Sequence, residues 1–475
     1  MAALPDDLTL TGLTADSLKA GPGMLFAALP GTKADGRAFI ADAVARGVAA
    51  VLAPEGTQPA GRGVRMILDA NPRRRFALMA AEFHGRQPAT MTAVTGTNGK
   101  TSTADFTRQI WMALGLRAAA IGTLGVVAPD WPNAGGLTTP DPETLHAALA
   151  ALAGAGIEHA CMEASSHGLS QYRLDGVRLK AAAFTNLTRD HLDYHADMAD
   201  YARAKLRLFT EVLPETGTAV VNADSDLADR VVAAAVRRGQ EVLTFGRMGH
   251  ALRLLSSSPA PVGQVLRLEI LGRPAEIRLP LAGGFQASNA LAALGLAVAA
   301  GAEPQAALAA LERLTGVPGR LQKVAERRSG AAIYVDYAHT PDALETVLRA
   351  LRPHADGRLA VVFGCGGDRD PGKRPQMGAI AARLADQVFV TDDNPRSEDP
   401  VAIRRAILAA CPAAVEIGDR GRAIREAIWQ MRRGDVLVLA GKGHERGQIV
   451  AGTVLPFDDG DEARRAVAEI DGGAP

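Results

Sequence analysis

Short apolar runs recur along this chain, and each is followed directly by a polar loop and then by a longer segment of helical periodicity. This alternation predicts βαβ units, and therefore the parallel sheets of an α/β fold. The runs are residues 91–94, 159–162, 181–184, 332–335, 359–363, 388–391 and 436–440. Because ligands of open parallel sheets bind beyond the carboxyl ends of the strands, the loops after these runs are the candidate site segments.

Length and two breaks in the pattern predict the domain organisation. The chain has 475 residues, too many for one hydrophobic core, and at about 150 residues per domain it would form three domains. Glycine- and proline-containing breaks at 85–88 and 315–319 divide it into residues 1–88, 89–316 and 317–475. We expect a small N-terminal α/β domain, a central parallel-sheet domain and a C-terminal Rossmann-like domain. The serine- and proline-rich stretch 255–261 predicts a loop within the central domain.

Charge and cysteine content exclude several classes of protein. The 52 Lys and Arg residues balance 52 Asp and Glu residues, so no net basic field is available to hold a nucleic acid. Cys161, Cys365 and Cys411 form no CxxC pair, which fits a reducing cytoplasm. The N-terminus lacks the pattern of a secretory signal, and the most apolar stretch, 290–302, is shorter than the ~20 residues that span a bilayer. We therefore expect a cytoplasmic protein without a membrane span.

The loop after residues 91–94 has the character of a phosphate-binding P-loop. It lies between a predicted strand and a helical pattern, so its backbone N–H groups would converge on an anion at a helix N-terminus. Lys100 would meet the β- and γ-phosphates of a nucleotide, and the Thr101 hydroxyl would bind Mg²⁺. The first glycine of the usual Gly-x4-Gly-Lys-Thr motif is missing, because Val94 stands in its place. The candidate ATP-binding residues of the loop are Gly96, Thr97, Asn98, Gly99, Lys100, Thr101 and Ser102.

Three further residues bear on a metal site. Glu163 and His191 each follow a predicted strand; a carboxylate suits Mg²⁺, whereas imidazole is a less usual ligand for it. Taken alone, each is better interpreted as a structural residue, and the nearby P-loop favours the metal interpretation. Lys205 stands in a helix-like run, where a solvated surface lysine is the simpler interpretation.

A charged pocket is predicted at the strand ends of the C-terminal domain. Arg369 and Arg396 could bind a carboxylate from two sides, and Asp393 and Glu445 could receive an ammonium group. Such a pocket would suit a zwitterion. The alternative is that 393–395 forms an Asx-Pro turn and that Arg396 is a surface charge, and the motif by itself leaves both open.

These blocks, taken in order, resemble the Mur ligase family over essentially the whole chain. The family has a short P-loop, which accounts for the missing first glycine. The resemblance implies an ATP-dependent amide ligase of cytoplasmic peptidoglycan precursor synthesis. Such enzymes transfer the γ-phosphoryl of ATP to the glutamate carboxylate of a UDP-linked substrate, and an amine then attacks the acyl phosphate. The matching blocks are residues 95–101, 163–168, 190–195, 335–341, 363–370, 393–396 and 441–445.

The resemblance also implies roles for single residues. Lys205 matches a lysine that the family carbamylates, and its carbamate would bind Mg²⁺ together with Glu163 and His191. Outside the P-loop, the residues that would reach ATP are Asn289, Arg320 and Asp336. The residues that would hold UDP-N-acetylmuramoyl-L-alanyl-D-glutamate are Ser17, Thr32, Lys33, Ala34, Thr138, Thr139, Ser165, Gln171 and Arg173.

The segment 393–396 resembles the signature of family members that add meso-diaminopimelate. Arg369 and Arg396 would bind the distal carboxylate that L-lysine lacks, so lysine would leave buried guanidinium donors without an acceptor. The residues implied for this amino acid are Arg369, Asp393, Asn394, Pro395, Arg396, Gly441 and Glu445.

Two other interpretations are a folylpolyglutamate synthetase-like ligase, which shares the P-loop ligase architecture, and a P-loop nucleotide switch. The N-terminal block at 30–37 and the segment 393–396 argue against the synthetase. A switch would hydrolyse ATP without an acceptor. We expect a monomer that binds small molecules and closes about residues 316–320.

Overall fold

The computed structural model of the protein describes residues 4–5, 8–31, 34–58, 63–132, 136–190, 194–260 and 263–472. It divides into two compact units. The first contains residues 1–255, 268–275 and 288–311, and the second contains residues 256–267, 276–287 and 312–475. The boundary between the units therefore passes through three strands, one α-helix and one 3-10 helix, and each unit is described by itself.

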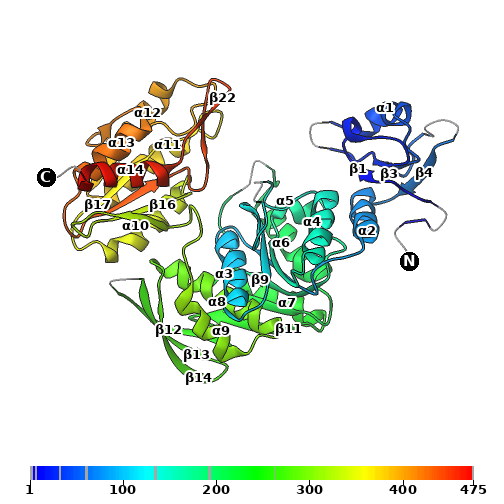
Figure 1. The fold of residues 1–475 in the computed structure, drawn as a ribbon, viewed down its shortest axis with the longest axis horizontal. Coiled ribbons are helices and arrows are strands. Elements are labelled where there is room, and N and C mark those ends of the chain that lie inside the picture. Colours follow the sequence, from blue (N-terminus) through cyan, green and yellow to red (C-terminus); the bar gives the residue numbers. More distant parts are fainter. Residues whose placement is uncertain are drawn as a thin grey trace. The chain divides into compact units, whose positions relative to one another are not determined.

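The N-terminal part of the first unit is a small parallel sheet in the order β1-β2-β3-β4 (Figure 1). It has two cores, one with Phe26 and Val51 and the other with Phe76, and all three residues are at most 1% exposed. Helix α2 follows the sheet and lies against α4 of the central part. The elements are β1 (Leu13–Thr14), β2 (Leu25–Ala27), α1 (Ile40–Ala45), β3 (Ala50–Pro54), β4 (Arg65–Asp69) and α2 (Pro72–His84).

The middle of the chain forms a ten-stranded sheet in the order β14-β13-β12-β11-β10-β9-β5-β8-β6-β7. The strands from β12 to β6 pair in parallel, and β7 pairs antiparallel to β6. The strands are β5 (Thr90–Thr95), β6 (Ala118–Gly122), β7 (Gly125–Val127), β8 (His159–Glu163), β9 (Leu179–Phe184), β10 (Thr218–Asn222), β11 (Glu241–Gly246), β12 (Leu252–Pro259), β13 (Gln264–Ile270) and β14 (Arg273–Leu279).

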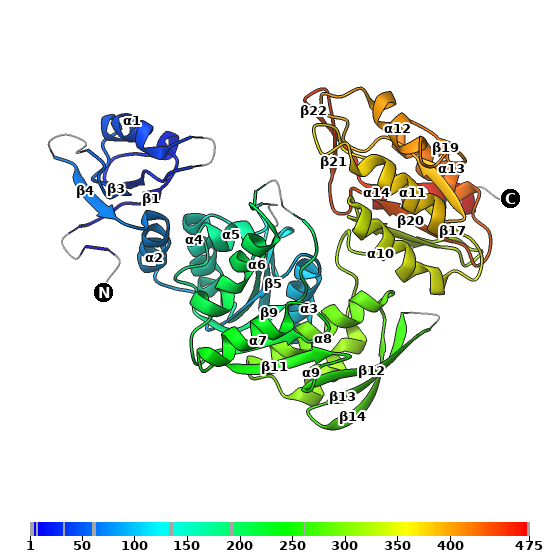
Figure 2. The same cartoon turned by 180° about the vertical axis from the view of Figure 1, so that it is seen from behind.

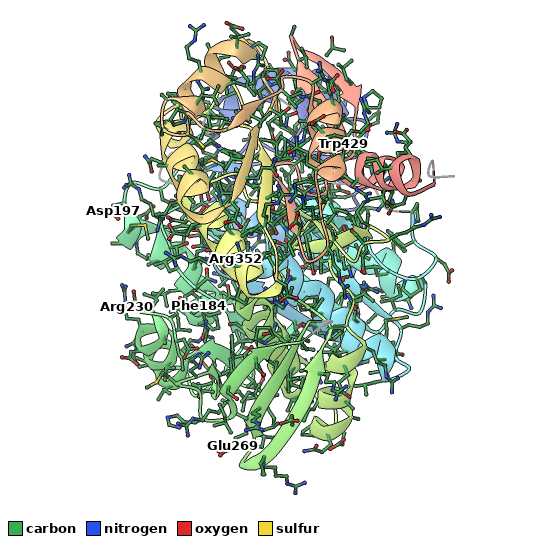
Figure 3. The ribbon with its side chains drawn as sticks, turned by 90° about the vertical axis from the view of Figure 1, so that its left-hand side faces the viewer. Phe184, Asp197, Arg230, Glu269, Arg352 and Trp429 are labelled. Carbon is green, nitrogen blue, oxygen red and sulfur yellow. The ribbon has the colours of Figure 1, made fainter. Side chains whose placement is uncertain are left out.

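Helices cover both faces of this sheet (Figures 1 and 2). Helices α4 to α7 pack on one face, where Phe184 at the end of β9 is fully buried (Figure 3), and α3 and α8 pack on the other. The helices are α3 (Lys100–Ala113), α4 (Pro142–Gly154), α5 (Ser166–Ser170), α6 (Met198–Arg207), α7 (Ala228–Arg237), α8 (Gly284–Ala299) and α9 (Pro304–Ala310). The loop predicted at 255–261 is wrong in part, because β12 extends to Pro259.

The second unit contains a six-stranded sheet in the order β15-β16-β20-β17-β18-β19, parallel except for β15. Alternate residues of β17 enter two separate cores, Val361 on one face and Val362 on the other. The strands are β15 (Gln322–Glu326), β16 (Ala332–Asp336), β17 (Leu359–Phe363), β18 (Gln387–Val390), β19 (Val415–Glu416) and β20 (Val436–Ala440), with a separate hairpin of β21 (Gly447–Val450) and β22 (Thr453–Pro456). The predicted α/β class with parallel sheets is confirmed.

Helices flank this second sheet on its two faces. Residues of α10, α11 and α12 join the core that contains Val361, and residues of α13 and α14 join the core that contains Val362. The helices are α10 (Pro341–Leu351), α11 (Lys373–Leu384), α12 (Pro400–Leu408), α13 (Arg420–Trp429) and α14 (Asp459–Gly472). Among the described residues, no helix has both the length and the apolar character to cross a membrane.

Candidate active site

The P-loop joins the end of β5 to the start of α3 and leaves no room for side chains at two positions. Gly96 and Gly99 have φ angles of +156° and +85°. A Cβ atom on Gly96 would lie 1.8 Å from Thr185 Oγ1, and one on Gly99 would lie 2.3 Å from Asn289 Oδ1. Only glycine fits this conformation and this close approach. The structure thus places Asn289 of α8 directly beside the loop.

Two lysines converge on one carbonyl of this loop. Lys100 Nζ donates hydrogen bonds to the carbonyl oxygens of Gly96 and Thr97, each at 2.8 Å, and Lys205 Nζ donates to Gly96 at 2.7 Å. Lys205 is 1% exposed, so its interpretation as a solvated lysine is wrong. Burial, and then the neighbouring Lys100, hold the pKa of the Lys205 amine well below its usual range.

The end of β9 braces the P-loop. Asn186 Oδ1 accepts from the Asn98 N–H at 2.9 Å, and Thr185 Oγ1 donates to the Asn98 carbonyl at 2.7 Å. The Thr188 N–H donates to Thr97 Oγ1 at 3.0 Å. The sequence predicts that this segment follows a strand, but no role for these side chains was predicted from it. The sequence feature that could have identified them is their position in a polar loop directly after a buried strand.

Glu163 ends β8 with its carboxylate buried. Its Oε1 accepts from the Thr123 N–H at 2.8 Å, and Oε2 accepts from Thr123 Oγ1 at 3.3 Å. Glu163 and Thr101 line one cavity of about 10 Å³, which is room for about one water molecule. Thr123 is a further residue of the site, and it was not predicted from the sequence.

The donors at this point suit a hard cation such as Mg²⁺, because one is a carboxylate and the other a hydroxyl. His191, also predicted as a ligand, lies outside the described residues. Within the described ranges, no group of three His, Cys, Asp or Glu side chains could hold a metal ion. Glu163 and Thr101 fit the ion, and the Lys205 side chain would fit it only as an oxygen ligand.

Four residues predicted for the nucleotide-linked substrate are joined by hydrogen bonds beside Glu163. Thr139 Oγ1 donates to the Glu163 carbonyl at 2.9 Å and lies 3.0 Å from Ser165 Oγ. Arg173 Nη1 donates to the Thr139 carbonyl at 2.6 Å, and Arg173 Nη2 donates to Gln171 Oε1 at 2.7 Å. The structure therefore brings these four residues together as one polar cluster.

Three other residues predicted for this substrate are described, Thr138 beside that cluster and Ser17 and Ala34 in the N-terminal part of the chain. Thr138 Oγ1 lies 3.0 Å from Thr123 Oγ1, which links it to the Glu163 carboxylate. Ser17 starts a short 3-10 helix, and the Ala34 carbonyl accepts from the Gly31 N–H at 2.9 Å. Thr32 and Lys33 lie outside the described residues.

In the second unit, the predicted arginine pair flanks one glycine. A Cβ atom on Gly366 would lie 2.7 Å from Arg396 Nη1 and 3.7 Å from Arg369 Cγ. Arg396 is half-buried, has a φ of +53° and donates to the Gly367 carbonyl at 2.8 Å, whereas Arg369 is exposed. Both side chains therefore lie at Gly366, but the sequence-based argument from two buried guanidinium groups is wrong for Arg369, which is exposed.

The acidic residues of the pocket lie at the ends of β18 and β20. Asn394 Nδ2 donates to Glu445 Oε2 at 2.9 Å, and a Cβ atom on Gly441 would lie 2.6 Å from Asp393 Oδ2. Beneath them, Arg420 forms a fully buried bidentate ion pair with Asp459, at 2.6 and 2.7 Å. The distance from Arg420 Nη1 to Asp393 Oδ2 is 4.0 Å. A buried cation thus underlies the Asp393 carboxylate.

Pro395 is buried between Asn394 and Arg396, with its carbonyl against Gly367. Asn394 Oδ1 accepts from the Ile449 N–H of β21 at 2.9 Å, and the Arg396 N–H donates to the Ile449 carbonyl at 3.0 Å. The segment is therefore held by hairpin β21–β22 and is more than a local Asx-Pro turn.

Arg320 and Asp336, predicted to reach ATP, belong to the second unit, whereas the P-loop belongs to the first. The Arg320 guanidinium carbon lies 4.7 Å from the Tyr337 ring centroid. Asp336 accepts from the Leu321 and Ala338 N–H groups at 2.6 and 2.8 Å. Burial raises the pKa of the Asp336 carboxyl to about 6, against the opposing effects of Arg320 and these N–H donors.

Three family models match the chain. They are the Mur ligase family catalytic domain over residues 9–84, the Mur ligase middle domain over 94–297 and the Mur ligase glutamate ligase domain over 319–443. The fold and the P-loop site, together with these matches, define an ATP-dependent ligase. The chain belongs to the Mur ligase family.

Individual relatives cover the whole length. The UDP-N-acetylmuramoyl-L-alanyl-D-glutamate--2,6-diaminopimelate ligase of Caulobacter vibrioides is 57% identical over 98% of this chain and 97% of the relative. The ligase of that name from Mesorhizobium japonicum is 55% identical over 98% of this chain and 96% of its own. A solved structure of a ligase with that name covers 98% of this chain and 97% of its own, with a TM-score of 0.73 and 35% identity.

A more distant likeness concerns the fold alone. A Mycobacterium tuberculosis folylpolyglutamate synthase structure is 23% identical and covers 78% of this chain and 92% of its own, with a TM-score of 0.62. The chain therefore shares its fold with the synthase, as the synthetase alternative assumed. Its sequence identity to the synthase is much lower than its identity to the diaminopimelate ligases.

Proposed function

We propose that the protein is the ligase that adds meso-diaminopimelate to UDP-N-acetylmuramoyl-L-alanyl-D-glutamate in cytoplasmic peptidoglycan precursor synthesis. The observation that carries the choice of amine is the pair Arg369 and Arg396 at Gly366, in the same unit as the Asn394–Glu445 contact. Two guanidinium groups suit the distal carboxylate, and Glu445 suits the ammonium group beside it. The full-length identity to ligases of that name supports this choice.

Amide formation requires that the glutamate carboxylate is first converted into a better electrophile. A carboxylate resists attack by an amine, so ATP first phosphorylates the substrate glutamate and supplies a leaving group. The P-loop N–H groups and Lys100 would stabilise the negative charge that develops on the transferred phosphoryl group. The amine then attacks the acyl carbon, and phosphate leaves. Mg²⁺, held by Thr101 and Glu163, would supply further neutralisation of phosphate charge.

We propose in addition that Lys205 is carbamylated. An uncharged amine is the form that reacts with CO₂, and burial beside Lys100 favours the uncharged form of Lys205. The product is a carbamate anion plus a proton, so a buried uncharged amine becomes an anionic oxygen ligand next to the cationic Lys100. The Lys100 cation would stabilise this anion, and the carbamate would add an oxygen donor to those of Glu163 and Thr101.

The wider organisation is proposed on the same basis. The divisions 1–88, 89–316 and 317–475 would bind UDP substrate, ATP and amino acid respectively, and each contains one of the matched family models. The enzyme would act as a monomer, because a single chain carries the residues for all three substrates.

The rate of ADP release tests the function against its alternatives. With Mg-ATP, we expect sustained ADP release only when UDP-N-acetylmuramoyl-L-alanyl-D-glutamate and meso-diaminopimelate are both present, in a one-to-one ratio with amide product. Release without either acceptor would instead identify a nucleotide switch. Release that depends on a folate and glutamate would identify a folylpolyglutamate synthetase.

A further inference from the structure

One wholly buried lysine in the second unit has no part in the mechanism above. Lys442 follows β20 and is 0% exposed. Its Nζ donates to Asn394 Oδ1 at 3.1 Å and to Glu445 Oε2 at 3.4 Å. An ammonium group placed wholly inside a protein is costly unless it is paired, so this position calls for an explanation.

The first consequence of Lys442 concerns the orientation of the Asn394 amide. Lys442 Nζ and the Ile449 N–H both point at the same atom, Asn394 Oδ1, and both are donors only. That atom must therefore be the oxygen, and the Asn394 NH₂ group must face Glu445 Oε2, 2.9 Å away. If the amide turned over, its oxygen would face the Glu445 carboxylate and repel it.

The second consequence concerns the Glu445 carboxylate itself. Both donors, Asn394 Nδ2 and Lys442 Nζ, contact Oε2. The Glu445 side chain is 34% exposed, although its lysine partner is buried. The carboxylate therefore contacts buried donors on one side and faces solvent on the other. Within the described chain, Oε1 then remains available for a ligand.

We propose that Lys442 is a positioning residue of the amino-acid pocket, which fixes the Asn394 amide and through it the Glu445 carboxylate. The Glu445 carboxylate in this position would bind the ammonium group of a ligand in which a carboxylate stands next to the ammonium. This assignment rests on the proposed function, since it takes the amino acid to bind at Glu445. Lys442 does not touch the amine, so its loss changes how well the pocket binds rather than the phosphoryl chemistry.

Steady-state kinetics of the full-length enzyme test this role, with meso-diaminopimelate and ATP varied in turn. We expect Lys442→Met to raise the KM for meso-diaminopimelate about tenfold or more, with the KM for ATP and the kcat changed by about twofold at most. Lys442→Gln restores a donor toward Asn394 Oδ1, so its KM should lie between those of the wild type and Lys442→Met. Lys323→Met is the matched control, because Lys323 forms an i,i+3 pair with Glu326 on an exposed surface.

Thermal unfolding of each variant accompanies the kinetics. An unchanged KM for the amino acid in folded Lys442→Met would overturn the assignment, as would equal increases in both KM values. Loss of the cooperative unfolding transition in both variants would also overturn it, since Lys442 would then be a residue of the folding core. These failures leave wild-type activity with meso-diaminopimelate intact, whereas a wild type without that activity refutes the proposed function and this inference together.

Discussion

Replacement of Lys205 by methionine is expected to lower kcat by about a thousandfold, the upper range for loss of one charge-stabilising group in an active site. Methionine fills the buried space but cannot carry a carbamate. It also removes the Lys205 hydrogen bond to the Gly96 carbonyl, which Lys100 Nζ still contacts. Binding of an ATP analogue should change little, because Lys100 and the glycines of the loop remain.

A spectroscopic measurement separates carbamylation from a merely structural role of Lys205. After equilibration with ¹³C-bicarbonate, the wild type should give a carbamate carbon signal that Lys205→Met lacks. Lys180→Met is the matched control, because Lys180 is an exposed lysine on β9. A wild type without the signal, or a Lys205→Met enzyme with more than about a tenth of the wild-type kcat, would contradict the proposal.

Replacement of Arg396 by alanine is expected to lower kcat/KM for meso-diaminopimelate strongly. Loss of one partner of a desolvated charge pair costs about 2–5 kcal/mol, or roughly 30-fold to several-thousand-fold. The larger effect should fall on Arg396 rather than Arg369, because Arg396 is half-buried and Arg369 is exposed. Arg396→Lys retains the charge but not the planar fork, and should recover only part of the loss.

The KM for ATP, measured in the same Arg396→Ala enzyme, shows whether the loss is confined to the amino acid. The KM for ATP should stay near its wild-type value in Arg396→Ala, because the P-loop lies in the other unit. Arg349→Ala is the control, since Arg349 pairs with Glu345 on the exposed side of α10. A loss in Arg396→Ala no larger than in Arg349→Ala would remove the argument for the carboxylate pocket.

The fold could be predicted largely from the sequence because its strands are buried on both faces. Such strands are continuous apolar runs, as at β17 and β20, and the polar residues begin where burial ends. The stretch 255–261 was wrongly predicted as a loop, because most of its residues are not buried. In β12, Leu252 and Leu254 are buried, but the serines beyond them are exposed or half-buried, so composition indicated a loop where backbone pairing makes a strand.

The site was only partly predictable, because burial and side-chain contacts depend on segments far apart in the chain. The spacing of the P-loop identified Gly96 and Gly99, but nothing local indicates that Asn289 and Thr185 press against them. The burial of Lys205 likewise comes from the loop that it contacts, more than a hundred residues earlier in the sequence. Thr123 lies outside the matching blocks, and Lys442 lies in the block 441–445 without a predicted role. Both were found only through their contacts with Glu163 and Glu445.

The most direct test of the proposed activity is the mass of the product formed from an equimolar mixture of meso-diaminopimelate and L-lysine. The purified protein is incubated with Mg-ATP, UDP-N-acetylmuramoyl-L-alanyl-D-glutamate and both amines. We expect the meso-diaminopimelate tripeptide product almost alone, because only this amine offers a distal carboxylate to Arg396 and Arg369. A product that contains lysine in equal or greater amount would contradict the assignment of the arginine pocket, and the absence of both products would contradict the proposed ligase.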